Sequence, residues 1–274
     1  NAACQIGKYL KGIKEFISIV VKSTVVPGTT DTLVRNAIER HSGKQLGDFG
    51  LGMNPEFLRE GEAVDDFMFP DRIVFGSEEE KTLELLKTLY RDWDCDKVEV
   101  NTRTAEMIKY ANNSLLATQI SAVNELANIS SEIKGVDIKN VIYGVTLDRR
   151  WNPIIENNRA NPGILSYLEP GCGFGGSCFP KDVAALRNFA TQIGAKSEIL
   201  NAVLKINEEQ PYQVIKLLKK NLTKLKNKKI LLLGLAFKPG TDDIRESVSM
   251  KVLQHLLIEK VFIFAHDPKA MDNA

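Results

Sequence analysis

The chain has 274 residues and a mass of 30.5 kDa, which is enough for about two domains. Hydrophobic residues make up 43%, charged residues 26%, and the net charge is +1. These values are typical of a globular protein in water and exclude the basic surface of a nucleic-acid-binding protein. No apolar run approaches the roughly 20 residues that span a bilayer, and no signal peptide is recognisable at the start. We therefore expect a cytoplasmic protein with neither a membrane nor a nucleic-acid partner.

Cysteine usage points to the same compartment. The four cysteines have no C-x-x-C spacing, and only three histidines accompany them. Neither a disulfide framework nor a zinc site is expected, and we predict no metal. Free thiols of this kind are typical of a reducing cytoplasm.

The first hundred residues alternate between short β-branched runs and helical patterns, after an opening that resembles the middle of a helix. Alternation of this kind predicts a mostly parallel sheet with helices on both faces. The predicted strands are Phe16–Val21, Phe49–Met53, Arg72–Gly76 and Val98–Val100, and the predicted helices are Leu33–Arg40 and Glu78–Trp93.

A long helix is predicted over Thr104–Lys134, where apolar residues recur at steps of three and four. Thr102 or Thr104 is expected to cap its start, and Gly135 is expected to end it in the left-handed conformation. At 1.5 Å per residue this helix is about 45 Å long, which suggests a connecting spine or a dimer interface.

Lys109 and Asn113 are four residues apart on that helix and therefore point in the same direction. Taken alone, the spacing favours a solvated lysine with a polar neighbour over a functional pair.

The segment 137–187 is predicted to be rich in loops and contains the most informative stretch, Pro170–Asp182, with the sequence P-G-C-G-F-G-G-S-C-F-P-K-D. Its glycines let the backbone approach a ligand closely. Lys181 beside Cys178 would favour a thiolate, the nucleophilic form, and Asp182 would orient or deprotonate a water molecule. The alternative is a tight turn that ends in an inert, buried cysteine. We favour a catalytic site.

The last part of the chain predicts helices over about Val183–Ile193 and Ala202–Leu222, and then a βαβ unit. That unit comprises Lys229–Leu233, Ser247–Lys260 and Val261–Ala265, and Asp267 follows its second strand. It is similar to half of a nucleotide-binding domain. The signal is weak alone, because no G-x-G-x-x-G occurs anywhere in the 274 residues.

Five stretches in this order resemble one family, the nucleotide-sugar 6-dehydrogenases of the UDP-glucose/GDP-mannose dehydrogenase type. They are Lys22–Thr29 (K-S-T-V-V-P-G-T), Asn54–Gly61 (N-P-E-F-L-R-E-G), Glu106–Asn113, Gly173–Asp182 and Gly234–Ser247 (G-L-A-F-K-P-G-T-D-D-I-R-E-S). The resemblance covers nearly the whole chain.

The resemblance implies an α/β fold with two Rossmann-like parallel-sheet domains, both incomplete here, joined by a long central helix and a helical dimerisation domain. Residues 1–100 would be the second half of the NAD-binding domain, 101–225 the central domain with the cysteine loop, and 226–274 the start of the UDP-binding domain. The chain would then be an internal fragment, and we expect it to turn over NAD⁺ poorly by itself. A homodimer through the central helix is implied.

The resemblance also implies a four-electron oxidation of a sugar alcohol at C6, with NAD as cofactor, through a thiohemiacetal and a thioester on Cys178. Lys109 and Asn113 would stabilise the oxyanion, Asp182 would handle a proton or position water, and Thr24 and Glu56 would hold that water.

Further positions carry over as binding residues. The implied cofactor contacts are Thr24, Glu60, Lys181 and Arg245. Of these, Lys181 would also reach the sugar nucleotide, and Arg245 would lie near the cofactor or the partner subunit. The implied substrate contacts are Phe57, Leu58, Arg59, Lys109, Asn113, Tyr167, Gly173, Gly175, Gly176, Phe237 and Lys238. Each position taken singly is equally consistent with a surface charge or a turn residue.

Some questions stay open at this stage. Asn161 stands where the family often has an arginine that reaches the neighbouring subunit, and Arg159 is a possible replacement. Phe179 after the cysteine favours UDP-glucose as substrate, with GDP-mannose and UDP-N-acetylmannosamine as alternatives. A degenerate binder of nucleotide-sugars would have no need for the thiol. A cysteine hydrolase would require a partner histidine, and none of His41, His255 and His266 is placed to serve Cys178.

Overall fold

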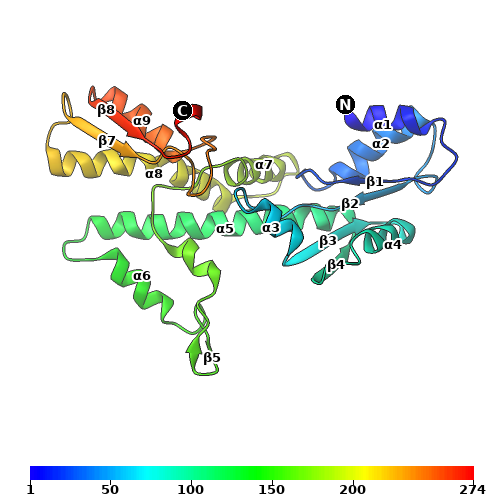
Figure 1. Cartoon of the computed structure of the whole chain (residues 1–274), viewed down its shortest axis with the longest axis horizontal. Coiled ribbons are helices and arrows are strands. Elements are labelled where there is room, and N and C mark those ends of the chain that lie inside the picture. The colour runs from blue at the N-terminus through cyan, green and yellow to red at the C-terminus, as the bar shows by residue number, and fades with distance from the viewer. The chain divides into compact units, whose positions relative to one another are not determined.

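The computed structural model describes residues 1–274 and divides into two compact units, Asn1–Asn112 and Asn113–Ala274. Each unit is described by itself, with the element labels of Figure 1. None of the helices combines the length and the apolar character that crossing a membrane requires.

The first unit is built on a four-stranded sheet in the order β1-β2-β3-β4. β1 runs parallel to β2 and β3 parallel to β4, whereas β2 and β3 are antiparallel. The α/β fold with a mostly parallel sheet is therefore confirmed, with a single antiparallel junction. The strands are Ser18–Val21, Gly50–Met53, Arg72–Ser77 and Asp96–Val100, and the other elements are α1 (Ala2–Leu10), a π-helical turn (Thr29–Val34), α2 (Arg35–Ser42), α3 (Ala63–Met68) and α4 (Glu80–Leu89).

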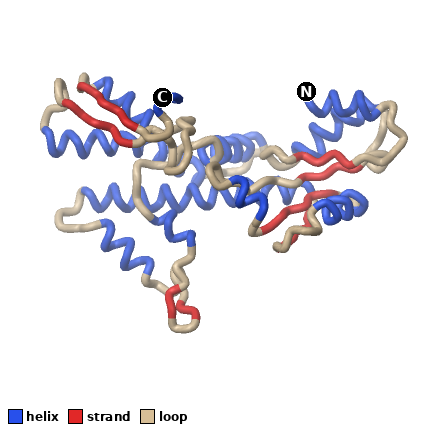
Figure 2. The backbone as a smooth tube through the Cα atoms, viewed as in Figure 1, coloured by secondary structure: helices blue, strands red, loops and turns tan.

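Helices cover both faces of this sheet, as Figure 2 shows. Alternate strand residues point to opposite faces, so one strand such as β3 contributes to two apolar clusters. Leu51 packs against α1 and α2, and Val74 packs against the start of α5, whereas Ile73 and Phe75 pack against α4. This burial on both faces explains the nearly continuous apolar runs of β2 and β3, whereas β4 at the edge of the sheet alternates with charged residues.

Helix α5 spans Thr102–Ser131 and includes residues of both units. The prediction of its cap was wrong. The side chain of Asn101 accepts a hydrogen bond from Thr104 N at 2.7 Å, so asparagine, an equally good capping residue, begins the helix. Gly135 does adopt the predicted left-handed conformation, with φ of 85°.

The second unit also contains α6 to α9 and two two-stranded sheets, β5-β6 and β7-β8. The segment 137–187, predicted to be rich in loops, also contains α6, which was not predicted; the Asp137 side chain caps this helix by accepting from Lys139 N at 2.9 Å. The elements are α6 (Ile138–Thr146), β5 (Ile154–Ile155), β6 (Asn158–Arg159), a 3₁₀ turn (Gly163–Leu168), α7 (Phe179–Gln192), α8 (Glu198–Leu222), β7 (Lys229–Leu233), α9 (Val248–Ile258), β8 (Phe262–His266) and a last 3₁₀ turn (Met271–Asn273).

β7 and β8 form a parallel pair, and α8 and α9 pack against one face of it (Figure 1). Ile215 from α8, Leu256 from α9 and Ile230 from β7 belong to one apolar cluster. The predicted βαβ unit is therefore present: β7 has the predicted bounds, and those of α9 and β8 differ by one or two residues.

Candidate active site

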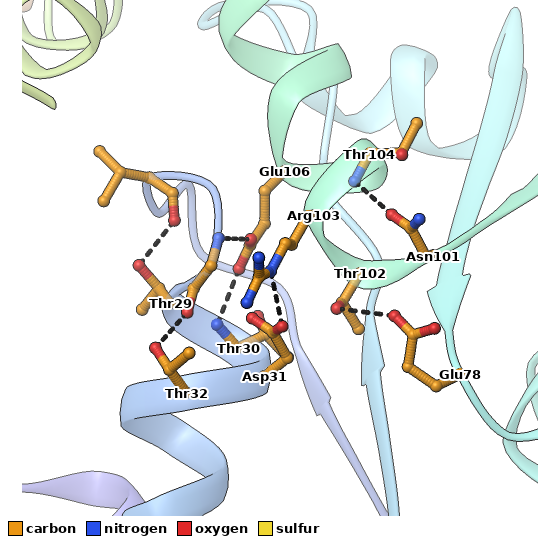
Figure 3. Close-up of polar contacts among 12 residues, drawn as sticks. Thr29, Thr30, Asp31, Thr32, Glu78, Asn101, Thr102, Arg103, Thr104 and Glu106 are labelled. Carbon is orange, nitrogen blue, oxygen red and sulfur yellow. Dashed lines mark hydrogen bonds and ion pairs between the residues drawn. The ribbon is translucent and has the colours of Figure 1, made fainter. Parts of the chain in front are cut away.

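The turn that follows β1 in the first unit is held by a buried carboxylate (Figure 3). Glu106, on the first turn of α5, is fully buried and accepts hydrogen bonds from Gly28 N at 2.6 Å and Thr30 N at 2.8 Å. Burial raises the pKa of Glu106, and the hydrogen bonds from Thr30 and Gly28 oppose that rise. Gly28 has φ of 91°, a conformation that other residues rarely adopt. Thr24 lies half-buried earlier in this turn.

A second buried contact joins the ends of neighbouring strands. The Asn54 side chain, 1% exposed, accepts hydrogen bonds from Lys22 Nζ at 2.7 Å and from the Tyr90 hydroxyl at 2.8 Å. Its amide nitrogen donates to Val74 O at 2.8 Å. Asn54 thus ties the segments that lead to Thr24 and to Glu56.

Lys109 is buried, which overturns the expectation of a solvated lysine. Its side chain is 4% exposed, and its ammonium lies 3.2 Å from Glu56 Oε1 and 5.2 Å from the centre of the Phe57 ring. The two partners of Lys109 have further contacts of their own. Glu56 Oε2 accepts a hydrogen bond from Leu58 N at 2.7 Å, and the Arg72 guanidinium lies 4.0 Å from the centre of the Phe57 ring. A buried cation in contact with one carboxylate is suited to stabilising negative charge on a ligand.

Arg59 and Glu60, two predicted binding residues in the same loop as Glu56, are less buried than Lys109. The Arg59 side chain is 63% exposed and pairs with Glu62 at 2.8 Å and with Asp66 at 2.6 Å, within its own loop. Glu60 is half-buried. Because Glu56 is engaged by Leu58 and Lys109, the predicted pairing of Thr24 with Glu56 stays a prediction.

In the second unit, Cys178 lies at the N-terminal cap of α7 and is partly exposed. The unpaired N–H groups at the start of a helix are suited to stabilising negative charge that develops on a ligand beside them. The Ser177 hydroxyl lies 3.7 Å from the Cys178 sulfur. The interpretation of an inert, buried cysteine does not fit this placement.

Asp182 lies one turn further along α7 and is 1% exposed. Its Oδ2 accepts from Asn113 Nδ2 at 2.7 Å, and its Oδ1 lies 2.7 Å from Lys181 Nζ without the angles of a hydrogen bond. Asn113 itself is 5% exposed, so it is a buried partner rather than a surface residue. Oδ1 thus keeps the capacity to accept from water or substrate.

The glycines before Cys178 lie against the loop that follows β7. A Cβ on Gly175 would lie 2.2 Å from Glu246 O, and one on Gly176 would lie 2.6 Å from the Phe237 ring. Gly176 N also donates to Arg245 O at 3.1 Å. Glycine is therefore required by close approach, and the structure brings four of the predicted substrate and cofactor residues together here.

The remaining predicted residues of this unit have local contacts. The Arg245 guanidinium pairs with Asp243 at 2.7 Å, and Lys238 Nζ lies 5.9 Å from the Phe237 ring. The Tyr167 ring lies 6.5 Å from that of Phe179, at the start of α7.

Arg159, a possible replacement for the missing intersubunit arginine, is engaged within the unit. Its guanidinium donates to Leu147 O at 2.7 Å and to Asn152 O at 2.9 Å. Its local role is to hold the loop before the cysteine segment.

Asp267 after β8 holds the backbone of the loop after β7. Its Oδ2 accepts from Leu235 N at 2.7 Å and Ala236 N at 3.1 Å, and its Oδ1 accepts from Lys269 N and Ala270 N, both at 2.8 Å. The hydrogen bond from Leu235, followed by those from the other three amides, holds the pKa of Asp267 well below its usual range.

Sequence reasoning missed the residues that hold these loops: Glu106, Arg72 and the buried amides of Asn124, Asn207 and Gln210. Apart from Arg72, which is half-buried on β3, each is a polar residue at a buried position on a helix. For those four, a polar residue within an apolar helical stripe was the available signal.

An α/β chain with a thiol at a helix N-terminus and a buried lysine fits the class of nucleotide-linked dehydrogenases. Three models of the UDP-glucose/GDP-mannose dehydrogenase family match consecutive parts of the chain: the NAD binding domain over residues 1–94, the central domain over 103–209 and the UDP binding domain over 231–274. The chain belongs to this family.

Relatives and solved structures agree with that assignment. The chain is 41% identical to UDP-glucose 6-dehydrogenase AglM of Haloferax volcanii, over 100% of this chain and 62% of that protein. It is 39% identical to UDP-glucose 6-dehydrogenase YwqF of Bacillus subtilis, over 100% of this chain and 58% of that protein. A UDP-glucose dehydrogenase structure from Pyrobaculum islandicum is similar with a TM-score of 0.89 and 40% identity, over 99% of this chain and 60% of that chain. The chain thus spans about three fifths of the length of these relatives.

Proposed function

We propose that the natural full-length protein oxidises UDP-glucose to UDP-glucuronate with NAD⁺, the activity of a UDP-glucose 6-dehydrogenase. The names of the relatives at 39–41% identity support this assignment. The observation that carries it is Cys178 at the N-terminus of α7 with the buried Asp182–Asn113 pair one turn away. A protein that only binds nucleotide-sugars needs no such thiol.

The residues of the first unit fit a dinucleotide. Thr24 and Glu56 follow the parallel strands β1 and β2, and dinucleotides bind beyond the carboxyl ends of such strands. When bound, NAD⁺ would accept a hydride from C6 of the sugar in each of two oxidations. We assign Thr24 and Glu60 to its nicotinamide end, with Lys181 and Arg245 as further contacts.

In the first oxidation the C6 hydroxyl passes its proton to water as the hydride leaves C6. Lys109 and Asn113 would donate hydrogen bonds to the oxygen that carries the developing negative charge. Glu56 holds the ammonium of Lys109 at 3.2 Å before substrate binds, which keeps that cation in place despite its burial.

The aldehyde needs a nucleophile before it can give a second hydride. The thiolate of Cys178 would add to C6, forming a C–S bond and an oxyanion, and loss of hydride would leave a thioester. Water positioned by Asp182, with Thr24 and Glu56 as further candidates, would then attack the acyl carbon. The C–S bond breaks, the thiolate leaves, and the proton of the water passes to Asp182.

We assign substrate binding to the backbone of residues 57–59 in the first unit and to a set of residues in the second unit. In the second unit these are Tyr167, Gly173, Gly175, Gly176, Phe237 and Lys238. The segments 1–100, 101–225 and 226–274 would serve NAD, catalysis with dimerisation, and UDP respectively.

We also propose that the protein is a homodimer through the central helix. Leu126 and Ile129 on α5 are about half exposed, at 49% and 54%, and Tyr143 on α6 is 65% exposed. Analytical ultracentrifugation at micromolar concentration tests this: a mass of one chain would contradict it, and twice that mass would support it.

The test of function is the amount of NADH formed per nucleotide-sugar by the full-length protein. Two NADH per UDP-glucose are expected, with loss of turnover in Cys178→Ser and little change in the matched variant Cys172→Ser, whose thiol is exposed in the same segment. Turnover only with GDP-mannose would keep the mechanism and overturn the sugar. Binding without NADH from any nucleotide-sugar would contradict the proposal.

A further inference from the structure

The backbone before Cys178 is bound by side-chain amides. Gly171 N donates to Asn124 Oδ1 at 2.7 Å, and Gly171 O accepts from Gln210 Nε2 at 2.8 Å. Phe174 N donates to Asn207 Oδ1 at 2.7 Å, and Phe174 O accepts from Asn207 Nδ2 at 3.0 Å. The two residues that flank Cys172 and Gly173 thus have all four backbone polar groups bound by carboxamides.

These amides are buried and each has one possible orientation. Asn124, Asn207 and Gln210 are 1%, 8% and 4% exposed. Asn207 must present oxygen to a backbone N–H and nitrogen to a backbone carbonyl, and Gln210 Oε1 accepts from Asn128 Nδ2 at 2.9 Å. We call Asn124, Asn128, Asn207 and Gln210 the amide clamp. It joins α5 and α8 to one short stretch of loop.

The clamp admits no side chain at Gly173. A Cβ there would lie 2.7 Å from Asn207 Oδ1, and φ is 103°. The approach of loop to helix is therefore as close as a backbone without a Cβ allows.

A packed pair of rings connects the clamp to the thiol. Phe174 is 5% exposed and packs with Val183 of α7 and Val203 of α8. Its ring lies 5.9 Å from that of Phe179, edge to face, and Phe179 directly follows Cys178. A shift of Phe174 would therefore move the first turn of α7 and the thiol at its N-terminus.

We propose that the amide clamp is a positioning device for Cys178: Asn207 and Gln210, supported by Asn124 and Asn128, fix the loop so that the thiol lies at the N-terminus of α7. This inference rests on the proposed function for its catalytic meaning. Its measurement, the reactivity of the thiol, does not depend on turnover. None of the four residues is a catalytic residue, because none contacts the thiol in the structure.

The experiment uses Asn207→Asp, which has the same shape. When ionised, its second oxygen cannot donate to Phe174 O, so the clamp is broken. When protonated, the carboxyl group donates again and the clamp is restored. Asn221→Asp is the matched control, because Asn221 is exposed on the same helix and donates to Leu217 O.

The measured quantity is the rate of alkylation of Cys178 by iodoacetamide in the full-length protein, resolved from Cys172 by fragment-ion mass spectrometry. Each rate is divided by that of the wild type at the same pH, which cancels the pH dependence that the two proteins share. We expect Asn207→Asp to react about tenfold more slowly at pH 8 and within twofold of the wild type at pH 5.5. The rate ratio of the control Asn221→Asp to wild type should stay near one at both pH values.

Two outcomes would overturn the inference. One is a rate ratio for Asn207→Asp that is the same at both pH values, and the other is faster alkylation at pH 8, which would mean that the loop merely covers the thiol. A melting curve by circular dichroism accompanies each sample. If the variant is unfolded at pH 8 but folded at pH 5.5, the ratio is followed up to the highest pH at which the variant stays folded: a fall from one supports positioning, and a value that stays at one contradicts it.

Wild-type protein that forms no NADH would refute the proposed function and leave this measurement unaffected. With turnover present, Asn207→Asp should lower kcat at pH 8 about tenfold with KM for UDP-glucose changed less than twofold.

Discussion

The loops that carry the candidate catalytic residues are held by different chemistry in the two units. In the first unit, a carboxylate, Glu106, holds the turn after β1, and an ammonium, Lys22, binds Asn54 at the ends of the strands. In the second unit, four neutral carboxamides hold the cysteine segment. Hydrogen bonds to charged groups are about twice as strong as neutral ones, but a buried charge costs desolvation and responds to pH.

The difference suits the chemistry proposed for each loop. A fixed charge close to a thiol would alter the thiolate fraction, whereas an amide positions the backbone and adds no net charge. The charges that act on Cys178 are then those of its own helix: the N-terminus of α7, Lys181 and Asp182. The turn after β1 carries no thiol, so an ionised anchor has no such consequence there.

The largest effect is expected for Glu106→Ala. The substitution leaves Gly28 N and Thr30 N buried without partners, and each orphaned donor costs about 1–3 kcal/mol. We expect the free energy of unfolding to fall by about 2–4 kcal/mol, measured by urea denaturation of the full-length protein.

The matched control is Glu125→Ala, on the exposed face of the same helix. It should change stability by less than about 0.5 kcal/mol. An equal loss in the two variants would mean that the turn does not depend on the buried carboxylate, and the comparison between charged and neutral anchors would fail.

Much of the fold could be predicted from the sequence, because periodicity reports burial directly. β7 was predicted with its observed bounds, and β3 to within one residue, since both are short apolar runs between polar turns. Helix α6 was missed, although Asp137 provided a cap signal before it. Short amphipathic helices on a surface have a pattern too brief to separate from a loop.

The site residues that lie in recognisable motifs could be predicted from the sequence. Those whose role depends on being buried beside a distant residue could not. Cys178 and Asp182 were identified from one segment. Lys109 and Asn113 read as surface residues from spacing alone, because only the fold brings Glu56 beside one and Asp182 beside the other. Glu106 and the amide clamp act through backbone groups far away in the chain, and no local pattern encodes such partners.

A charged anchor also occurs in the second unit, and it sharpens the comparison. Asp267 binds four backbone amides of two loops, so Asp267→Asn replaces one accepting oxygen with a donor that faces other donors. We expect a lower melting temperature at pH 7. Because the pKa of Asp267 is depressed in the folded protein, its stabilisation is present above the ordinary carboxyl pKa and lost as the pH falls through about 4 and below.

The measurement is the difference in melting temperature between wild type and Asp267→Asn from pH 7 down to pH 3. The difference should shrink as the pH falls. Asp272→Asn, at an exposed position nearby, should show little difference at any pH. If the difference in melting temperature between wild type and Asp267→Asn instead grows as the pH falls, the proposed role of the four backbone amides is contradicted.

The smallest expected effect is a pH dependence that differs between the two kinds of anchor. Burial raises the pKa of Glu106 in the folded protein. The contribution of Glu106 to the free energy of unfolding is therefore fully present below the pKa of the unfolded chain, and it declines as the pH rises through the pKa of the folded protein. The stability of wild type relative to Glu106→Gln should therefore decrease from about pH 4 to pH 7. Asn207→Leu removes a group that does not titrate, so its deficit relative to wild type should be constant over the same range. Urea denaturation at each pH gives the difference in unfolding free energy between wild type and each variant. If the difference for Asn207→Leu changes with pH as steeply as the difference for Glu106→Gln, the cysteine segment depends on a titrating group, and the distinction between the two kinds of anchor fails.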